Sequence, residues 1–283
     1  MLNGKVYGMS SAPKWIESQI AFVNEEWRQR SEPPRIFNRE SRHANTSRHD
    51  VVIHNARLQE EEYDLDDCGY ILVNHKTAVS EFRNKEVVAQ QYFPEMQEVI
   101  LELTGAHTAL PFSFYQVRSK RPDNFFDAYS LYMHCDFSPD TWLQLAQSIV
   151  QTSGTEEQYP EDEWDFALYN LWRPIERPVE KDPLVLIDAR TIEREDIVNY
   201  LAIEEGTNAL AAIPLFNKNQ KYCYFPNMTP DEVLVFKQLD SRIDKSLVCP
   251  HTSFIDPSAA ADAGERESID IRFMCVFPKE KVN

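Results

Sequence analysis

Short runs rich in valine, isoleucine, phenylalanine and tyrosine recur along the chain, separated by clusters of proline, aspartate and asparagine. This composition and spacing are typical of β-strands with tight connections. The pattern predicts strands at residues 51–54, 70–75, 109–117, 128–135, 164–172, 183–189, 220–225, 232–239 and 268–277.

Helical spacing is confined to a few segments. We predict a helix at residues 93–103, followed by Gly105 as a natural stop, because four apolar side chains share one stripe there: Met96, Val99, Ile100 and Leu103. Two further helices are predicted at about residues 139–151 and 192–200. Strands without regularly alternating helices favour an antiparallel sandwich or jelly roll over a doubly wound sheet.

The beginning of the chain differs from the rest. Residues 1–48 are polar and rich in arginine, serine and asparagine, with a possible short helix at about residues 15–27. We predict a partly irregular N-terminal arm over residues 1–48 and a single domain with a helical flank over residues 49–283.

Charge narrows the function classes. The formal net charge is −17, with 29 basic and 46 acidic residues, so a nucleic-acid or anionic-membrane surface would be repelled. Neither GxGxxG nor GxxxxGK[ST] occurs among the 7 glycines, and no run of about 18 apolar residues exists. The 5 cysteines are scattered, which is typical of reduced thiols. We therefore expect a cytoplasmic protein that acts on a small molecule, not on nucleic acid or membranes.

Two potential metal ligands end the predicted strand at 128–135. His134 and Asp136 are two residues apart, so on an extended backbone both side chains project to one side. An imidazole and a carboxylate in this arrangement can hold one metal ion, although a histidine and a capping aspartate also end strands without binding metal.

A third potential ligand and a polar strand follow near the end of the chain. His251 lies where a short β-type run meets a turn, and the later segment RESIDIR alternates two isoleucines with polar side chains. The polar face is either a solvated edge or the lining of a small barrel, where an arginine can clamp a carboxylate. Its members are Arg266, Ser268, Asp270 and Arg272.

The order HxD, distant His, then RxS resembles the Fe(II)/2-oxoglutarate-dependent dioxygenases. The blocks MHCDFSPDTW, YNLWRPIERPVEKDPLVLIDAR, YCYFPNMTPDEVLVFKQLDS, PHTSFIDP and RESIDIR are similar to the branch that includes the cephamycin hydroxylase component CmcJ, gibberellin-desaturase-like fungal proteins and the meroterpenoid endoperoxide synthase NvfI. The resemblance covers roughly residues 65–278. It implies a mainly β fold (α+β) around a double-stranded β-helix core, and an oxygenase that uses Fe(II), 2-oxoglutarate and O2.

The resemblance also implies roles for particular residues. His134, Asp136 and His251 would be the iron ligands at the catalytic centre. Arg266 would bind the distal carboxylate of 2-oxoglutarate with help from Ser268, and Arg272 on the same strand face is the alternative clamp.

Other residues are candidates for the pocket walls. Asn170 could contact the iron-bound end of 2-oxoglutarate. Trp172, Tyr115 and Tyr132 are candidates for the substrate pocket, and a structural role is the alternative for each. Cys135 should point away from the metal and serve packing.

The implied reaction is oxidation of an unactivated C–H bond in a secondary metabolite, with a terpenoid-like intermediate as the expected substrate. The outcome could be hydroxylation, desaturation, rearrangement or endoperoxidation. The alternatives are an iron oxidase of the same fold that does not use 2-oxoglutarate, and a non-catalytic jelly-roll binding protein. A homodimer in which the arm reaches the second subunit is also expected.

Overall fold

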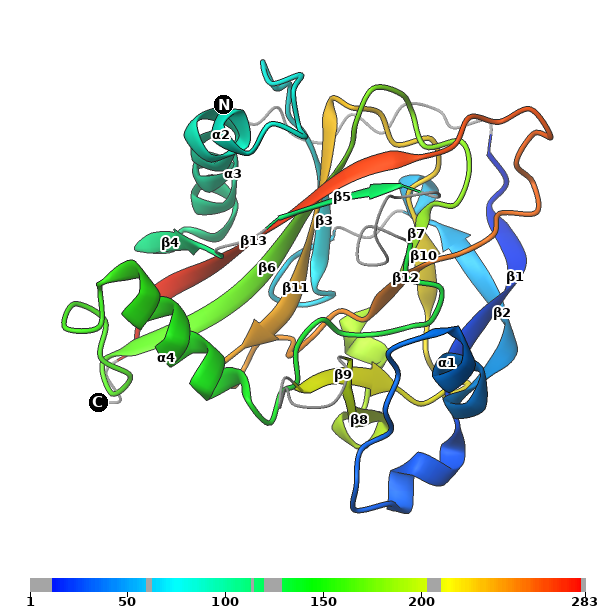
Figure 1. Ribbon diagram of the computed structural model, residues 1–283, viewed down its shortest axis with the longest axis horizontal. Helices are drawn as coiled ribbons and strands as arrows, with labels where there is room; N and C mark the ends of the chain where they lie inside the picture. Colours follow the sequence, from blue (N-terminus) through cyan, green and yellow to red (C-terminus); the bar gives the residue numbers. More distant parts are fainter. Residues whose placement is uncertain (1–11, 60–62, 113–114, 120–128, 203–209, 281–283) are drawn as a thin grey trace.

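Two β-sheets face each other and form the body of the protein (Figure 1). A computed structural model gives the fold and describes residues 12–59, 63–112, 115–119, 129–202 and 210–280. The mainly β prediction and the jelly-roll core are confirmed. Among the helices of these residues, none combines the length and apolar character needed to cross a membrane.

The smaller of the two facing sheets has five strands in the spatial order β1-β2-β10-β7-β12. Their bounds are Trp15–Val23, Thr46–Asn55, Tyr222–Tyr224, Leu184–Ile187 and His251–Ser253. A separate hairpin pairs β8 (Ile197–Leu201) with β9 (Leu210–Pro214).

The larger sheet has the order β3-β11-β6-β13-β4, and β5 also pairs with β13. These strands are Tyr70–Asn74, Glu232–Asp240, Trp164–Pro174, Glu267–Pro278, Thr108–Pro111 and Gln116–Ser119. The long antiparallel pair of β6 and β13 runs through its middle, with Asn170 opposite Arg272 and Trp172 opposite Asp270.

The two longest helices cover opposite faces of the larger sheet. Apolar side chains of α3 (Phe93–Thr104) pack on one face, which carries Ile269, Ile271 and Phe273. Those of α4 (Trp142–Ser153) cover one end of the other face, around Phe166 and Met274. The other helical segments are short: α1 (Arg39–Asn45), α2 (Lys85–Val87), a π turn (Val88–Tyr92) and 3-10 turns at Glu25–Gln29, Ala56–Leu58, Ala189–Thr191 and Arg194–Asp196.

The rest of the face covered by α4 looks into the molecule and is unusually polar. Because side chains two residues apart lie on one side of a strand, the register places five residues of β6 and β13 together on this face: Asn170, Trp172, Ser268, Asp270 and Arg272. All five are buried, so the alternating RESIDIR segment lines an interior, not a solvated edge.

Three local predictions are wrong. Trp15–Val23 is strand β1, not part of a helix, and it pairs with β2 along its whole length. The boundary expected at residue 48 therefore lies inside β2. Ile197–Leu201 is also a strand, since its branched and aromatic residues pair with β9. In the described part of the run 128–135, pairing is limited to single bridges at His134 and Cys135. The helix at 93–103 and its Gly105 stop, which is left-handed with φ 64°, are confirmed.

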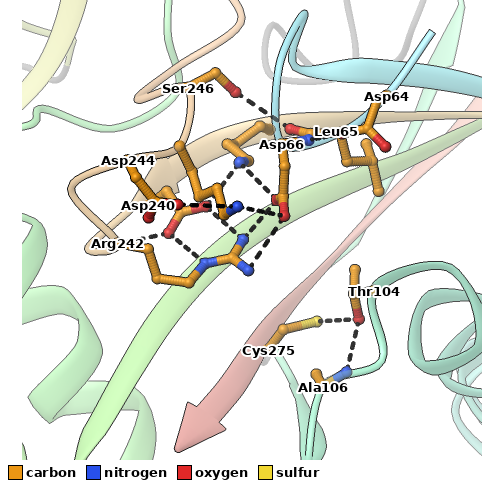
Figure 2. A network of polar contacts seen from close by, with 12 residues as sticks. Asp64, Leu65, Asp66, Thr104, Ala106, Asp240, Arg242, Asp244, Ser246 and Cys275 are labelled. Atoms are coloured by element: carbon orange, nitrogen blue, oxygen red, sulfur yellow. Dashed lines mark hydrogen bonds and ion pairs between the residues drawn. The ribbon is translucent and has the colours of Figure 1, made fainter. Parts of the chain in front are cut away.

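A partly buried ionic network fixes the end of β11 to the segment before β3. Figure 2 shows Asp66 and Asp240 around the guanidinium of Arg242, with Ser246 bonded to the backbone of Leu65. Lys237 adds a fully buried ion pair to Asp240, at 2.7 Å. The network holds the connection between β11 and β12, which leads to His251.

Candidate metal centre and adjoining cavity

Three side chains with metal-binding atoms converge between the two sheets. One ligand-type atom from each of His134, Asp136 and His251 lies within 4.8 Å of the others. Nε2 of His134 is 3.4 Å from Oδ1 of Asp136, and Nε2 of His251 is 4.0 Å from the same oxygen. Two imidazoles and one carboxylate oxygen on one side of a site form the facial arrangement typical of non-haem Fe(II) oxygenases.

Backbone pairing brings the two histidines together. The N–H of His134 donates to the carbonyl of His251 at 3.1 Å, and the N–H of His251 donates back at 2.9 Å. Cys135 makes the same reciprocal contact with Ala212, and its side chain is buried among apolar groups away from the cluster, as predicted. Two single β-bridges thus hold the HxD segment in place. The bridge between the histidines joins residues 117 positions apart in sequence, the difference between 251 and 134.

Both imidazoles suit metal binding through Nε2. Nδ1 of His134 lies 3.0 Å from the backbone carbonyl of Tyr132, a contact that orients the ring and leaves Nε2 directed at Asp136. Burial, followed by the neighbouring His134, lowers the pKa of His251 to about 3. His251 is therefore neutral near pH 7, and the neutral imidazole is the form that binds metals.

The carboxylate of Asp136 is held through its second oxygen. Oδ2 accepts hydrogen bonds from Nδ2 of Asn170 at 2.8 Å and from Nε and Nη2 of Arg272 at 3.0 and 2.7 Å. Burial alone would raise the pKa of Asp136, but Arg272 and the two histidines outweigh it and hold the pKa well below its usual range. Asp136 is thus a carboxylate, and Oδ1 is the oxygen that faces the histidines.

A cavity adjoins the three side chains, and Arg266 lies in its wall. His134, His251, Arg266, Trp172 and Asp270 all line it. Arg266 is 2% exposed, and its Nε and Nη1 have no hydrogen-bond partner in the part of the chain that the structure describes. Burial lowers the pKa of Arg266 to about 10, so the guanidinium still carries its charge near pH 7. A buried cation with free donors beside a potential metal site is suited to binding an anion.

Of the other predicted residues, Ser268 has an unpaired side chain like that of Arg266 within the described part of the chain, whereas Arg272 and Asn170 contact Asp136. Ser268 lies two residues after Arg266 and is fully buried, and its Oγ also lacks a partner among the described residues. Arg272, the alternative clamp, binds Asp136 and Asp270 instead. Asn170 likewise contacts Asp136, while its own Oδ1 is buried without a partner in the described chain.

The three aromatic candidates differ in position. Trp172 lines the cavity, with the guanidinium carbon of Arg266 5.3 Å from its ring centre. Tyr132 packs beside His134, and its hydroxyl is 3.2 Å from that of Tyr200. Tyr115 lies away from the cavity, because it packs against Phe93 on the face covered by α3.

Sequence reasoning assigned no role to several residues that the structure places at the site, and Asp270 and Arg118 are the charged ones among them. Asp270 lines the cavity and contacts Arg272, and its only sequence signal was the polar alternation of RESIDIR. Arg118 of β5 lines the same cavity, since β5 pairs with β13 so that Arg118 lies opposite Ser268. A four-residue strand with one arginine gave no sign of this position.

Comparison with known proteins agrees with this geometry. A family model described as "Oxidoreductase/YMDC permease-like domain" matches residues 20–276. The Fe(II)/2-oxoglutarate-dependent dioxygenase nvfI of Aspergillus novofumigatus is 27% identical over 276 residues, which cover 93% of this chain and 98% of nvfI. The hydroxylase/desaturase efuI of Hormonema carpetanum is 29% identical, over 82% of this chain and 84% of efuI.

Solved structures show the same fold. One structure of the iron and alpha-ketoglutarate-dependent endoperoxidase NvfI, titled as a different conformation, has a TM-score of 0.83 at 25% identity, covering 95% of this chain and 100% of that one. Another NvfI structure has a TM-score of 0.78 at 26% identity, covering 94% and 99%.

The fold, the clustered side chains and these relatives define an oxidoreductase of the Fe(II)/2-oxoglutarate-dependent dioxygenase class, whose cofactor and co-substrates are Fe(II), 2-oxoglutarate and O2. Within this class, the chain belongs to the oxidoreductase family whose model matches residues 20–276. The resemblance seen in the sequence is confirmed.

Proposed function

We propose that His134, Asp136 and His251 hold the iron, and that Arg266 and Ser268 bind the distal carboxylate of 2-oxoglutarate. The reaction is oxidation of an unactivated C–H bond in a secondary metabolite. When bound, Fe(II) would activate O2, which is the oxidant, and 2-oxoglutarate would supply two of the four electrons that O2 takes up, leaving as succinate and CO2.

The unsatisfied donors beside the three ligand-type atoms are the main support. Nε and Nη1 of Arg266 and Oγ of Ser268 are buried without partners among the described residues, in or next to the wall that carries His134 and His251. Leaving buried donors unpaired is costly, and a carboxylate would satisfy them. This set fits a dicarboxylate whose other end reaches the metal. It also disfavours an iron oxidase without 2-oxoglutarate, which has no use for such a pair.

An apolar substrate is supported by the apolar part of the cavity wall. Trp172, Leu184 and Phe236 contribute large apolar surfaces to the same cavity. The relatives carry names that include hydroxylase, desaturase and endoperoxidase. On this basis we assign the enzyme a terpenoid-like biosynthetic intermediate as substrate, and the outcomes to compare are hydroxylation, desaturation, rearrangement and endoperoxidation.

Succinate release tests the proposed function. Purified protein incubated with Fe(II), ascorbate and 2-oxoglutarate should form succinate, and His134→Ala and Asp136→Ala should not. Both variants should keep the circular dichroism of the parent, because neither side chain belongs to an apolar core cluster. Asp136→Ala should melt at a lower temperature, because it removes a partner of the buried Arg272. Wild-type succinate formation by His134→Ala would refute the ligand assignment. Metabolite profiles of a deletion strain would then identify the substrate.

We extend the proposal to location and assembly. The 5 cysteines are all buried and free, which suits a reducing compartment such as the cytoplasm. Trp15 is 53% exposed on β1, an edge strand of the five-stranded sheet, and supports a homodimer through this edge. Analytical ultracentrifugation of wild type and Trp15→Ser tests the dimer, which the substitution should weaken.

A further inference from the structure

Asp136 is restrained on one side only. Three hydrogen bonds end on Oδ2, two of them from the planar fork of Arg272, whereas Oδ1 is the oxygen within 3.4 Å of His134. A carboxylate whose two oxygens differ in this way presents a single atom to a metal ion. Rotation that brought Oδ2 toward the metal would break all three bonds.

Arg272 is itself held by a second acid. Its Nη2 donates to Oδ2 of Asp136 at 2.7 Å and to Oδ2 of Asp270 at 3.0 Å. Asp270 and Arg272 are two residues apart on β13, so they share one face, and they are 4% and 2% exposed. The result is a buried chain of acid, base and acid that runs from the cavity wall to the candidate metal ligand.

We propose that Arg272, fixed by Asp270, is a positioning residue that keeps Asp136 a one-oxygen ligand. The inference rests on the proposed iron site. Two imidazoles and one carboxylate oxygen leave three positions of an octahedral metal open, and a chelating co-substrate and O2 require all three. A two-oxygen Asp136 would occupy one of them. Asp270 is the second acceptor of the Arg272 guanidinium and holds it in the position from which it binds Asp136.

Metal titration separates this role from that of the carboxylate clamp. Co(II) is titrated calorimetrically into wild type, Arg272→Lys and Asp270→Asn, without 2-oxoglutarate. Lysine keeps the charge but cannot form the two-pronged contact, and asparagine keeps the shape without the charge. Because partners of metal ligands typically contribute 10- to 100-fold to metal affinity, we expect Co(II) binding to weaken by about that factor in both variants. The visible absorption of bound Co(II) should also change in Arg272→Lys, because the number of ligating oxygens changes.

Arg266→Lys is the matched control, since this equally buried arginine does not touch Asp136. It should bind Co(II) like wild type. Wild-type affinity and spectrum in both test variants would overturn the proposal, and wild-type behaviour of Asp270→Asn alone would overturn the role of Asp270. If circular dichroism shows that Arg272→Lys does not fold, the Co(II) affinity of the near-isosteric Asp270→Asn tests the proposal. If wild type binds no Co(II), or binds no better than His134→Ala, the proposed iron site itself fails.

Discussion

The guanidinium carbon of Arg266 lies 4.0 Å from the ring centre of Tyr129, and the hydroxyl of the same tyrosine donates to the backbone carbonyl of Arg266. One aromatic residue therefore fixes both the main chain and the side chain of the arginine. Nε and Nη1 have no partner among the described residues, so the proposed clamp is held in place with donors available for a carboxylate.

Arg266→Ala should weaken 2-oxoglutarate binding sharply. Removing one partner of a buried charge-assisted contact costs about 3–5 kcal/mol, which corresponds to roughly 100-fold or more in affinity. The concentration of 2-oxoglutarate that gives half-maximal succinate formation measures the loss. Arg266→Lys keeps the charge without the fork and should fall between wild type and alanine. A large effect in Arg272→Ala with none in Arg266→Ala would instead identify Arg272 as the clamp.

Lys237 and Asp240 should be essential to stability, because both side chains of this ion pair are fully buried. Lys237→Met leaves Asp240 with less compensation, and we expect the free energy of unfolding to fall by about 3–5 kcal/mol in urea titrations. Asp244→Asn is the control within the network of Figure 2, since its partner Lys245 and Asp244 itself are at the surface. Equal, small effects of the two substitutions would show that the buried pair contributes no more than the surface pair.

The first strand should behave as part of the core. Phe22 is 0% exposed and contacts the rings of Phe216 and Tyr222 edge to face. Phe22→Ala should therefore cost about 3–5 kcal/mol of stability, whereas Glu17→Ala on the same strand should cost little because Glu17 is exposed. Thermal unfolding of the two variants checks this. Similar melting temperatures would mean that β1 docks only loosely.

Acid should destabilise the fold partly through His75. Burial, and then the charge of Arg173, lower the pKa of His75 below 6.5, because its Nδ1 lies 2.7 Å from Nη2 of Arg173. Below about pH 6.5 the unfolded chain binds a proton that the folded chain rejects, so stability falls as the pH is lowered toward the folded pKa. His75→Asn keeps an acceptor for Arg173 and does not titrate. Urea titrations at several pH values should show a flatter pH dependence for this variant, and parallel profiles would contradict the assignment.

The sequence pattern predicted those helices and strands whose own residues show the period of a buried face. The stripe of α3 and the branched, aromatic runs of β6, β11 and β13 were visible because burial of one face imposes a period on the sequence. Trp15–Val23 was mistaken because its apolar and polar residues occur in blocks and do not alternate, and because its strand character depends on pairing with β2. Propensity alone does not contain that pairing.

The candidate site could be predicted from the family resemblance more than from the spacing of its residues along the chain. His134 and Asp136 share a side of the chain, but their distance from His251 is set by a bridge between segments far apart in sequence. The contact of Arg272 with Asp136 spans 136 residues in the same way, so residue types alone could not distinguish the proposed clamp, Arg266, from the proposed positioning residue, Arg272. Tyr115 was predicted to line the substrate pocket, but it packs against Phe93 on the opposite face of the sheet.

The reciprocal backbone bridge between His134 and His251 has a consequence for the loss and rebinding of a metal ion. Main-chain pairing brings the two rings together, so the proposed chelating pair is assembled as the chain folds. On the proposed iron assignment, loss of the ion would remove its contribution to stability but leave this backbone bridge in place. Rebinding of a metal ion would then not require a second round of folding.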